Sequence, residues 1–170
     1  MAGDEPAAGR VVVGVGGSLA SLAALRAAAE EARRGGRTLL AVTAWEPPEG
    51  EGLYLRHPDP AWARHWRNEA RERLDRAFDA VFGGAPQGVV TERRLIRSRP
   101  GPALCDLVTG PDDLVVLGVR PGRRRMGRVH RYVRSHAACA VLTVPAPEVP
   151  KGLRRALRKV TAEDFALVGH

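Results

Sequence analysis

The amino-acid sequence predicts an α/β fold, a doubly wound parallel sheet with helices on both faces. Three observations support this. Five short segments rich in apolar and β-branched residues alternate with segments of helical periodicity. The apolar runs at residues 11–15 and 114–117 are continuous rather than alternating, which is typical of strands buried on both faces. The length of 170 residues fits a single domain.

The five expected strands and four expected helices follow in alternation along the chain. Ser18 can cap the first helix, Gly35 and Gly36 can end it, and Pro102 can open the third. We expect strands at residues 10–15, 37–45, 89–96, 114–118 and 139–144, and helices at 19–34, 61–82, 103–108 and 129–136. Charge pairs such as Glu69 with Arg73 are expected along the second helix. Residues 46–60, rich in proline and glycine, are expected to form a long loop.

The chain divides into a domain and two flanking segments. Residues 1–9 are expected to be a disordered N-terminus, residues 10–147 the domain, and residues 148–170 a C-terminal tail. In the tail, apolar residues at helical spacing alternate with basic ones, which predicts a short basic amphipathic helix at about residues 153–160. Such a helix can dock on the domain, lie on an anionic membrane or contact nucleic acid, and we expect docking because its apolar stripe is short. The first residues lack the pattern of a signal peptide, and no apolar run approaches the ~18 residues of a membrane span, so we expect a cytoplasmic protein.

The positive charge is concentrated in two stretches. The net charge is +8, yet residues 119–134 hold seven arginines and residues 151–160 hold five basic residues, with no acid in either stretch. The remainder is therefore mildly acidic. A local basic stretch indicates an anionic partner, such as a phosphate ligand or nucleic acid, although surface arginines can also simply be solvated.

Residues that often carry chemistry form no legible catalytic or metal-binding set. Cys105 and Cys139 lie in apolar segments and are expected to be buried thiols, since no Cys-x-x-Cys or His-x-x-x-His spacing occurs. Trp62 and Trp66 are four apart on one helix, and we expect them in the core or covering the sheet. The histidines, among them His57, His65, His130 and His136, are expected to be packing or surface residues. We therefore expect neither an enzyme nor a metal site.

Two glycine-containing loops are expected to face each other. Gly16-Gly17-Ser18 follows the first strand, and residues 118–127 follow the fourth. Ligands of doubly wound sheets bind at the carboxyl ends of the strands, where the strand order changes direction. A strand, a glycine loop and a helix N-terminus together offer backbone N–H groups to a phosphate. The sequence thus predicts an anion site between these loops.

Four motifs in order resemble the universal stress proteins. Residues 12–18 (VVGVGGS) are similar to that family's V-V-G-V-D-G-S, and residues 113–120 (DLVVLGVR) to D-L-L-V-V-G-S-R. Residues 41–48 (AVTAWEPP) resemble its second strand and exit, and residues 135–141 (SHAACAV) resemble H-H-A-P-C-P-V. The resemblance covers residues 10–145. It implies the strand order 3-2-1-4-5, a non-enzymatic stress-response role, an adenine-nucleotide pocket, and a homodimer formed through strand 139–144.

The departures from the family pattern concern the nucleotide. ATP-binding members carry G-x2-G-x9-G-(S/T) after the fourth strand. Here Gly118 and Gly127 match the first and third glycines, but their interval is four residues shorter, Pro121 replaces the second glycine, and Arg128 replaces the Ser/Thr. Gly16 stands where the family has an aspartate. These changes predict a degenerate pocket with weak ATP affinity, in which arginines replace backbone N–H donors.

The expected site residues follow from this resemblance. Nucleotide contacts, with the adenine near Val42, are expected from Gly16, Gly17, Ser18, Val42, Gly118, Arg120, Gly122, Gly127, Arg128 and Val129. Anion contacts are expected from Arg123, Arg124 and Arg125. The alternative is a basic anion- or nucleic-acid-binding module that uses the arginine-rich loop 119–134 and the C-terminal helix.

Overall fold

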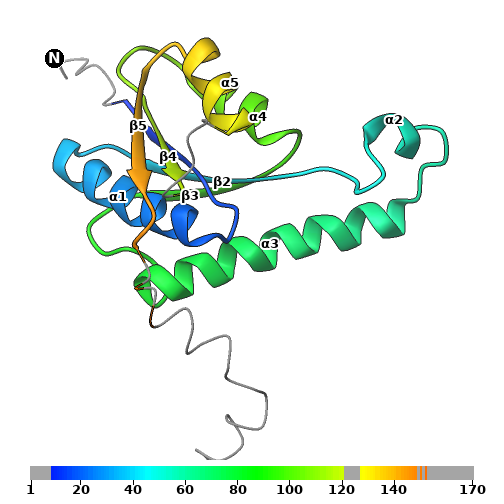
Figure 1. Ribbon diagram of the computed structural model, residues 1–170, viewed down its shortest axis with the longest axis horizontal. Coiled ribbons are helices and arrows are strands. Elements are labelled where there is room, and N and C mark those ends of the chain that lie inside the picture. The colour runs from blue at the N-terminus through cyan, green and yellow to red at the C-terminus, as the bar shows by residue number, and fades with distance from the viewer. Residues whose placement is uncertain (1–8, 121–126, 149, 151, 153–170) are drawn as a thin grey trace, which may run out of the picture.

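The protein is built on one parallel sheet of five strands, in the order β3-β2-β1-β4-β5. The computed structural model describes residues 9–120, 127–148, 150 and 152 (Figure 1). The strands are β1 Val11–Gly14, β2 Leu39–Trp45, β3 Thr91–Arg97, β4 Leu114–Val119 and β5 Ala140–Pro145. Both the parallel pairing and the order are as the sequence and the family resemblance predicted.

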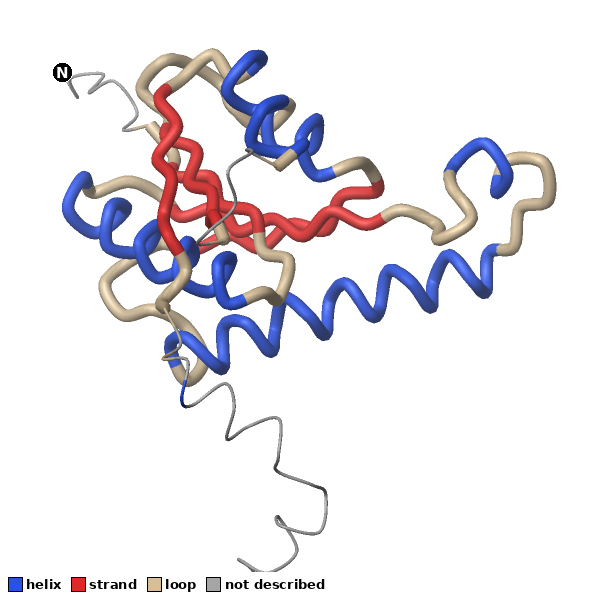
Figure 2. Tube along the Cα trace, in the orientation of Figure 1, coloured by secondary structure: helices blue, strands red, loops and turns tan. Residues whose placement is uncertain are grey.

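Helices cover both faces of this sheet (Figure 2). The long helices α1 and α3 pack on one face, and α4 and α5 pack on the other. Their bounds are α1 Leu19–Gly35, α3 Pro60–Phe82, α4 Pro100–Cys105 and α5 Arg128–His136. The doubly wound architecture predicted from the alternation of elements is therefore confirmed.

The central strand β1 explains why its sequence is a run of valines. Val11, Val12 and Val13 are all fully buried. Because side chains alternate across a strand, Val11 and Val13 join the core under α1 and α3, while Val12 joins the core under α4 and α5. A strand buried on both faces leaves no position for an unpaired polar side chain, so the apolar pattern is continuous.

Asp113 ties the start of β4 to the start of β1. Its carboxylate accepts hydrogen bonds from the backbone N–H groups of Arg10 and Thr109, both at 2.6 Å, and from the Thr109 hydroxyl at 2.9 Å. Burial by itself would raise the pKa of Asp113, but these three hydrogen bonds and the nearby Arg10 guanidinium hold that pKa below its usual range. The aspartate at the head of the 113–120 motif is thus a structural residue.

The connection expected to be a loop contains a short helix, and α4 differs from its expected bounds. Helix α2, Glu51–Tyr54, lies within residues 46–60. It is fixed by a two-point contact in which Arg97 Nε and Nη2 donate to the Glu51 carboxylate at 3.1 and 3.0 Å. Helix α4 begins at Pro100, before Pro102, and ends at Cys105. A proline suits either position, because the first-turn N–H groups have no intrahelical acceptor.

Two expectations about side chains on α3 are wrong. Trp62 is 56% exposed, because the N-terminal half of α3 extends beyond the sheet, and its ring instead stacks on Trp66 with centroids 6.3 Å apart. The expected pair of Glu69 with Arg73 is replaced by an approach of 3.8 Å between Glu69 Oε1 and His65 Nε2.

The remaining sequence-based expectations differ in detail or cannot be placed. The two cysteine thiols are half-buried rather than buried. Strand β3 begins at Thr91, two residues later than expected. Other expectations fall outside the described residues: the disordered N-terminus expected at residues 1–9, apart from Gly9, the contacts expected from Gly122 and from the three arginines Arg123, Arg124 and Arg125, and the helix expected at residues 153–160.

Candidate functional site: two adjoining cavities at the carboxyl ends of the strands

A cavity of about 260 Å³ lies where the strand order changes direction. We call it the first cavity. It is bounded by the exits of β1, β2 and β4 and by the first turns of α1, α4 and α5, and its lining comprises Gly14, Val15, Gly16, Ser18, Ser21, Val42, Ala44, Pro100, Leu104, Leu117, Gly118 and Val129. This is the position at which doubly wound sheets bind ligands.

The structure brings together several residues that the sequence placed in the site. Gly16, Ser18, Val42, Gly118 and Val129 all line the first cavity. Gly17, Arg120, Gly127 and Arg128 are described but are not part of its lining. Contact of any of these residues with a nucleotide stays a prediction. Sequence reasoning missed Ser21 and Leu104, which reach the cavity from helices whose packing the sequence does not reveal.

The turn between β1 and α1 is shaped by capping. Ser18 is the N-cap of α1, and its hydroxyl accepts a hydrogen bond from the backbone N–H of Ser21 at 3.2 Å. The Ser21 hydroxyl donates in return to the Ser18 carbonyl at 2.9 Å. Gly17 has φ +81°, a conformation that favours glycine. Gly16 has an ordinary φ, and the space that a Cβ atom on it would occupy is open to a distance of 4 Å.

Gly118 has a packing role as well as a place in the cavity wall. A Cβ atom built on it would lie 2.1 Å from the carbonyl oxygen of Ala20 and 2.9 Å from the backbone nitrogen of Ser21. The start of α1 therefore approaches the end of β4 so closely that only glycine fits. From the sequence, Gly118 was expected to let a ligand approach the backbone closely. In this structure, the group that approaches its backbone closely is the start of helix α1.

The described walls of the first cavity are apolar or weakly polar. Among residues 9–120 and 127–148, none that line it is charged. Thr43 fixes the neighbouring strand ends, since its hydroxyl donates to the Val15 carbonyl at 3.0 Å and is itself buried. Such walls suit an uncharged ring and hydroxyl groups rather than a phosphate.

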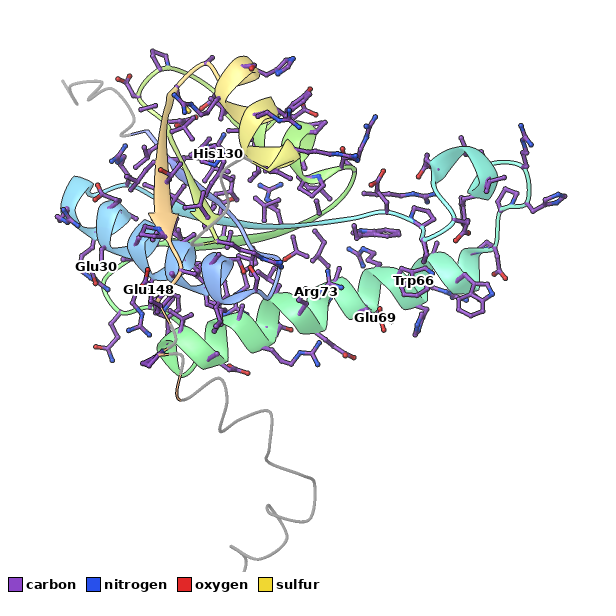
Figure 3. The ribbon with its side chains drawn as sticks, in the orientation of Figure 1. Glu30, Trp66, Glu69, Arg73, His130 and Glu148 are labelled. Atoms are coloured by element: carbon purple, nitrogen blue, oxygen red, sulfur yellow. The ribbon has the colours of Figure 1, made fainter. Side chains whose placement is uncertain are left out.

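A second cavity, of about 450 Å³, adjoins the first. The two cavities share Ala44 and Pro100. The second is walled by the exits of β2 and β3 on one side and by Trp66, Glu69 and Arg73 of α3 on the other (Figure 3). Sequence reasoning missed this cavity, although the spacing of these three residues places them on one face of a helix.

Three further titratable residues are buried or half-buried. His130 on α5 is only 7% exposed, and neither of its ring nitrogens has a hydrogen-bond partner among the described residues. Burial, with the Arg134 guanidinium nearby, lowers the pKa of His130. Burial raises the pKa of the Cys105 and Cys139 thiols. In the part of the chain that the structure describes, no group of three or more His, Cys, Asp or Glu could hold a metal ion.

The model of the universal stress protein family matches residues 8–145, which is most of the chain. The chain belongs to the universal stress protein family. This universal stress protein matches no curated protein. Within its described residues, no helix is both long enough and apolar enough to cross a membrane.

Solved structures agree with this assignment. A universal stress protein in complex with cAMP is 26% identical, with a TM-score of 0.51, over 83% of this chain and 99% of that one. A universal stress protein family member from Burkholderia pseudomallei is 24% identical, with a TM-score of 0.56, over 83% and 98% of the two chains. UspA from Lactobacillus plantarum is 20% identical, with a TM-score of 0.56, over 81% and 97%. The last two share the fold.

Proposed function

We propose that this universal stress protein is a non-enzymatic regulatory protein that binds an adenine nucleotide weakly, with the adenosine part in the first cavity. The observation that carries the proposal is the cavity itself, which joins the turn after β1, the exit of β2 and the end of β4 at the point where the strand order changes. A relative that is 26% identical was solved in complex with cAMP, which supports an adenine nucleotide as the ligand.

The walls of the first cavity fit the base and the ribose. Val42, Leu104 and Leu117 offer apolar surface to a planar ring. Ser18 and Ser21 offer hydroxyl groups within the same cavity. The arrangement is that of a small-molecule site, with a mostly apolar lining and a few polar groups that fix orientation.

Weak affinity follows from the departures at the loops. Gly16 supplies no carboxylate, and the described lining holds no cation. A hydrogen bond to a charged group contributes about 1.5–3 kcal/mol, so the loss of one weakens binding roughly 10- to 100-fold.

The chemistry of the described residues supports a binding protein rather than an enzyme. The raised pKa values of Cys105 and Cys139 keep both thiols protonated at neutral pH, so neither is an activated nucleophile. The lowered pKa of His130 belongs to a buried ring that does not line either cavity. These features favour a role in which the bound nucleotide alters the protein rather than being converted by it.

The test is isothermal titration of adenosine, AMP and ATP at near-physiological salt. We expect saturable one-to-one binding, which Gly16→Leu should abolish because a side chain at this open position fills the cavity. Gly110→Leu is the matched control, since that glycine is equally open and has an ordinary φ but does not line the cavity. Binding that survives Gly16→Leu, or tight magnesium-dependent ATP binding, would contradict the proposal.

A second candidate function is binding of a polyanion by α5. Arg128, Arg131 and Arg134 are exposed on this helix, which carries no acidic residue, and exposed Arg120 follows the preceding strand, β4. A salt titration with duplex DNA tests it, because the affinity for nucleic acid falls linearly on logarithmic axes as the salt concentration rises. Replacement of Arg128 and Arg131 by alanine should reduce that slope by about two; an unchanged slope would exclude α5 as the contact.

A further inference from the structure

Helix α1 carries a second apolar face, away from the residues that rest on the sheet. A groove of about 610 Å³ follows this face, and we call it the α1 groove. It is bordered by Val81 near the end of α3 and by Pro147, which follows β5. The α1 groove shares no lining residue with either cavity at the strand exits, so it is a separate feature of the surface.

The apolar part of the α1 groove is open to solvent. Leu19 is 58% exposed, and Leu22, Ala23 and Ala27 are half-buried. These four residues recur at intervals of three and four, so they form one stripe along the helix. At a rise of about 1.5 Å per residue, the stripe is about 12 Å long. Single exposed apolar residues are ordinary, but a continuous stripe is suited to cover by another segment.

The chain itself leads to this groove. Strand β5 runs toward the last turn of α3 (Figure 1), and Pro147, just after the strand, lines the groove. Five residues further on, Gly152 has helical conformation and is exposed. Residues 153–170 follow and lie outside the described residues. The tail of the protein therefore begins at the border of an apolar stripe.

The sequence of the tail matches the groove in pattern and in length. Leu153, Ala156, Leu157 and Val160 recur at helical spacing. A helix over these residues presents an apolar stripe about 11 Å long, close to the length of the stripe on α1. When extended, the linker from Pro147 to Leu153 reaches about 20 Å at most, which is enough to lay the helix along the groove.

The linker also favours this occupant over a separate molecule. A short flexible linker holds its segment at an effective concentration in the millimolar range. A separate protein at micromolar concentration would have to bind about a thousand-fold more tightly to compete equally. The tail of the same chain is therefore the favoured occupant of the α1 groove.

Charge agrees with this fit but does not decide it. The charged residues that line the α1 groove balance, two arginines against two glutamates, and Glu31 is paired with Arg34 at 3.2 Å. The border at α3 is different, because the last turn of that helix includes the exposed Asp79 and holds no basic residue. A helix C-terminus carries partial negative charge, so this border favours the basic residues that flank the apolar stripe of the tail.

We propose that residues 153–160 form a helix that docks its apolar stripe in the α1 groove of the same chain. The α1 groove is thus an intramolecular docking surface, and the basic residues of the tail face solvent and the end of α3. This inference concerns a face of the protein that the proposed function does not use, and it does not depend on the binding of a nucleotide.

Limited digestion of the full chain with trypsin tests the proposal. The tail offers five cleavage positions within residues 151–160, and intact-mass spectrometry distinguishes them from cuts elsewhere. The cleavage rate follows the undocked population when docking is fast relative to cleavage. Leu157→Gln in the tail should speed these cuts about 10-fold, as expected for the loss of one buried leucine. The groove variant, in which Leu19 and Ala27 are both replaced by glutamine, should have the same effect.

The matched control is Leu53→Gln. Leu53 is 56% exposed on α2 and does not line the α1 groove, so its replacement should leave the cuts in the tail unchanged. Glutamine is a good helix former, and far-UV circular dichroism should show that the groove variant keeps its helices. Leu157→Gln leaves the residues of the groove as they are, so the two variants probe opposite sides of one contact.

Three results would overturn the proposal. The first is cleavage of the tail in the unmodified protein at the rate seen in Leu157→Gln. The second is faster cleavage in Leu157→Gln but not in the groove variant, which would place the tail on another surface of the domain. The third is protection that appears only with vesicles containing anionic lipid, which would assign the tail to a membrane surface.

Mixing the two variants separates docking within one chain from docking between two copies. The groove variant keeps an intact tail, and the Leu157→Gln protein keeps an intact groove. If the tail docks in its own chain, each protein in the mixture should be cut as fast as it is alone. Slower cleavage of the groove variant in the mixture would place its tail in the groove of a second copy, and docking within one chain would then be wrong.

Discussion

Replacement of Gly118 by alanine tests the packing on which the first cavity depends. The single added methyl group would lie 2.1 Å from the Ala20 carbonyl oxygen and 2.3 Å from its carbonyl carbon. Ordinary van der Waals contact lies at 3.4–4 Å, so β4 and α1 must separate by more than 1 Å. Both groups are backbone, and neither can move away by a change of rotamer.

The expected cost follows from the burial of these elements. Helix α1 rests on the sheet through fully buried residues such as Ala24, Leu25 and Ala28. Shifting it loosens a close-packed core, and overpacking in such cores costs about 1–3 kcal/mol. Because the clash involves a rigid helix rather than a flexible side chain, we expect the upper part of this range, about 3 kcal/mol. That is a large fraction of the about 5–15 kcal/mol by which domains are stable.

Urea unfolding followed by circular dichroism measures this cost by linear extrapolation. Gly16→Ala is the matched control, because it adds the same methyl group to the facing loop at a position with free space and an ordinary φ. The control is expected to be neutral or to stabilise by about 0.4–1 kcal/mol, since alanine reduces the entropy of the unfolded chain. A Gly118→Ala variant within about 0.5 kcal/mol of the unmodified protein would refute the reasoning.

Three further predictions concern other buried or edge positions. Asp113→Asn should cost about 2–3 kcal/mol at neutral pH, because the carboxylate accepts three hydrogen bonds. Since the pKa of Asp113 is lowered in the folded state, this contribution is complete above the unfolded pKa and is lost as the pH falls through the folded pKa. The gap between the urea curves of the two proteins should therefore narrow on acidification, and a constant gap would contradict this. The pKa of His130 is also lowered in the folded state, so below the unfolded histidine pKa of about 6.5 the unfolded state binds more protons than the folded state. The free energy of unfolding should therefore fall by up to about 1.4 kcal/mol per pH unit as the pH drops below about 6.5. His130→Leu should remove that slope, and an unchanged slope would assign it to other groups. Strand β5 is paired with β4 on one side only within the described sheet, so we expect a homodimer through its free edge, with a light-scattering mass twice that of the 18.3 kDa chain. The Ala146 N–H donates to the Val119 carbonyl of β4, and because N–H groups alternate in direction along a strand, the Thr143 N–H points to the free edge of β5. Thr143→Pro removes that N–H donor and should therefore yield the single-chain mass. A single-chain mass for the unmodified protein would contradict the dimer.

Much of the fold is determined by local sequence pattern. The valines of β1 are apolar without interruption because both faces of that strand are buried, and the periodicity of α1 reflects one buried face, so each element could be predicted from its own residues. The family motifs added the strand order, which local patterns do not encode. From that order, the meeting of the turns after β1 and β4 followed, because the carboxyl ends of parallel strands lie at one edge of the sheet.

The tertiary structure alone decided which distant residues touch. Gly118 must be glycine because of Ala20, almost a hundred positions earlier, and the second cavity needs Trp45, Arg73 and Ser98 from three separate elements. No periodicity or motif marks such contacts, since they depend on how helices lie on the sheet rather than on the conformation of either segment. The same reason explains Trp62: its helical spacing predicted burial, but the end of α3 on which it stands extends past the sheet that would have covered it.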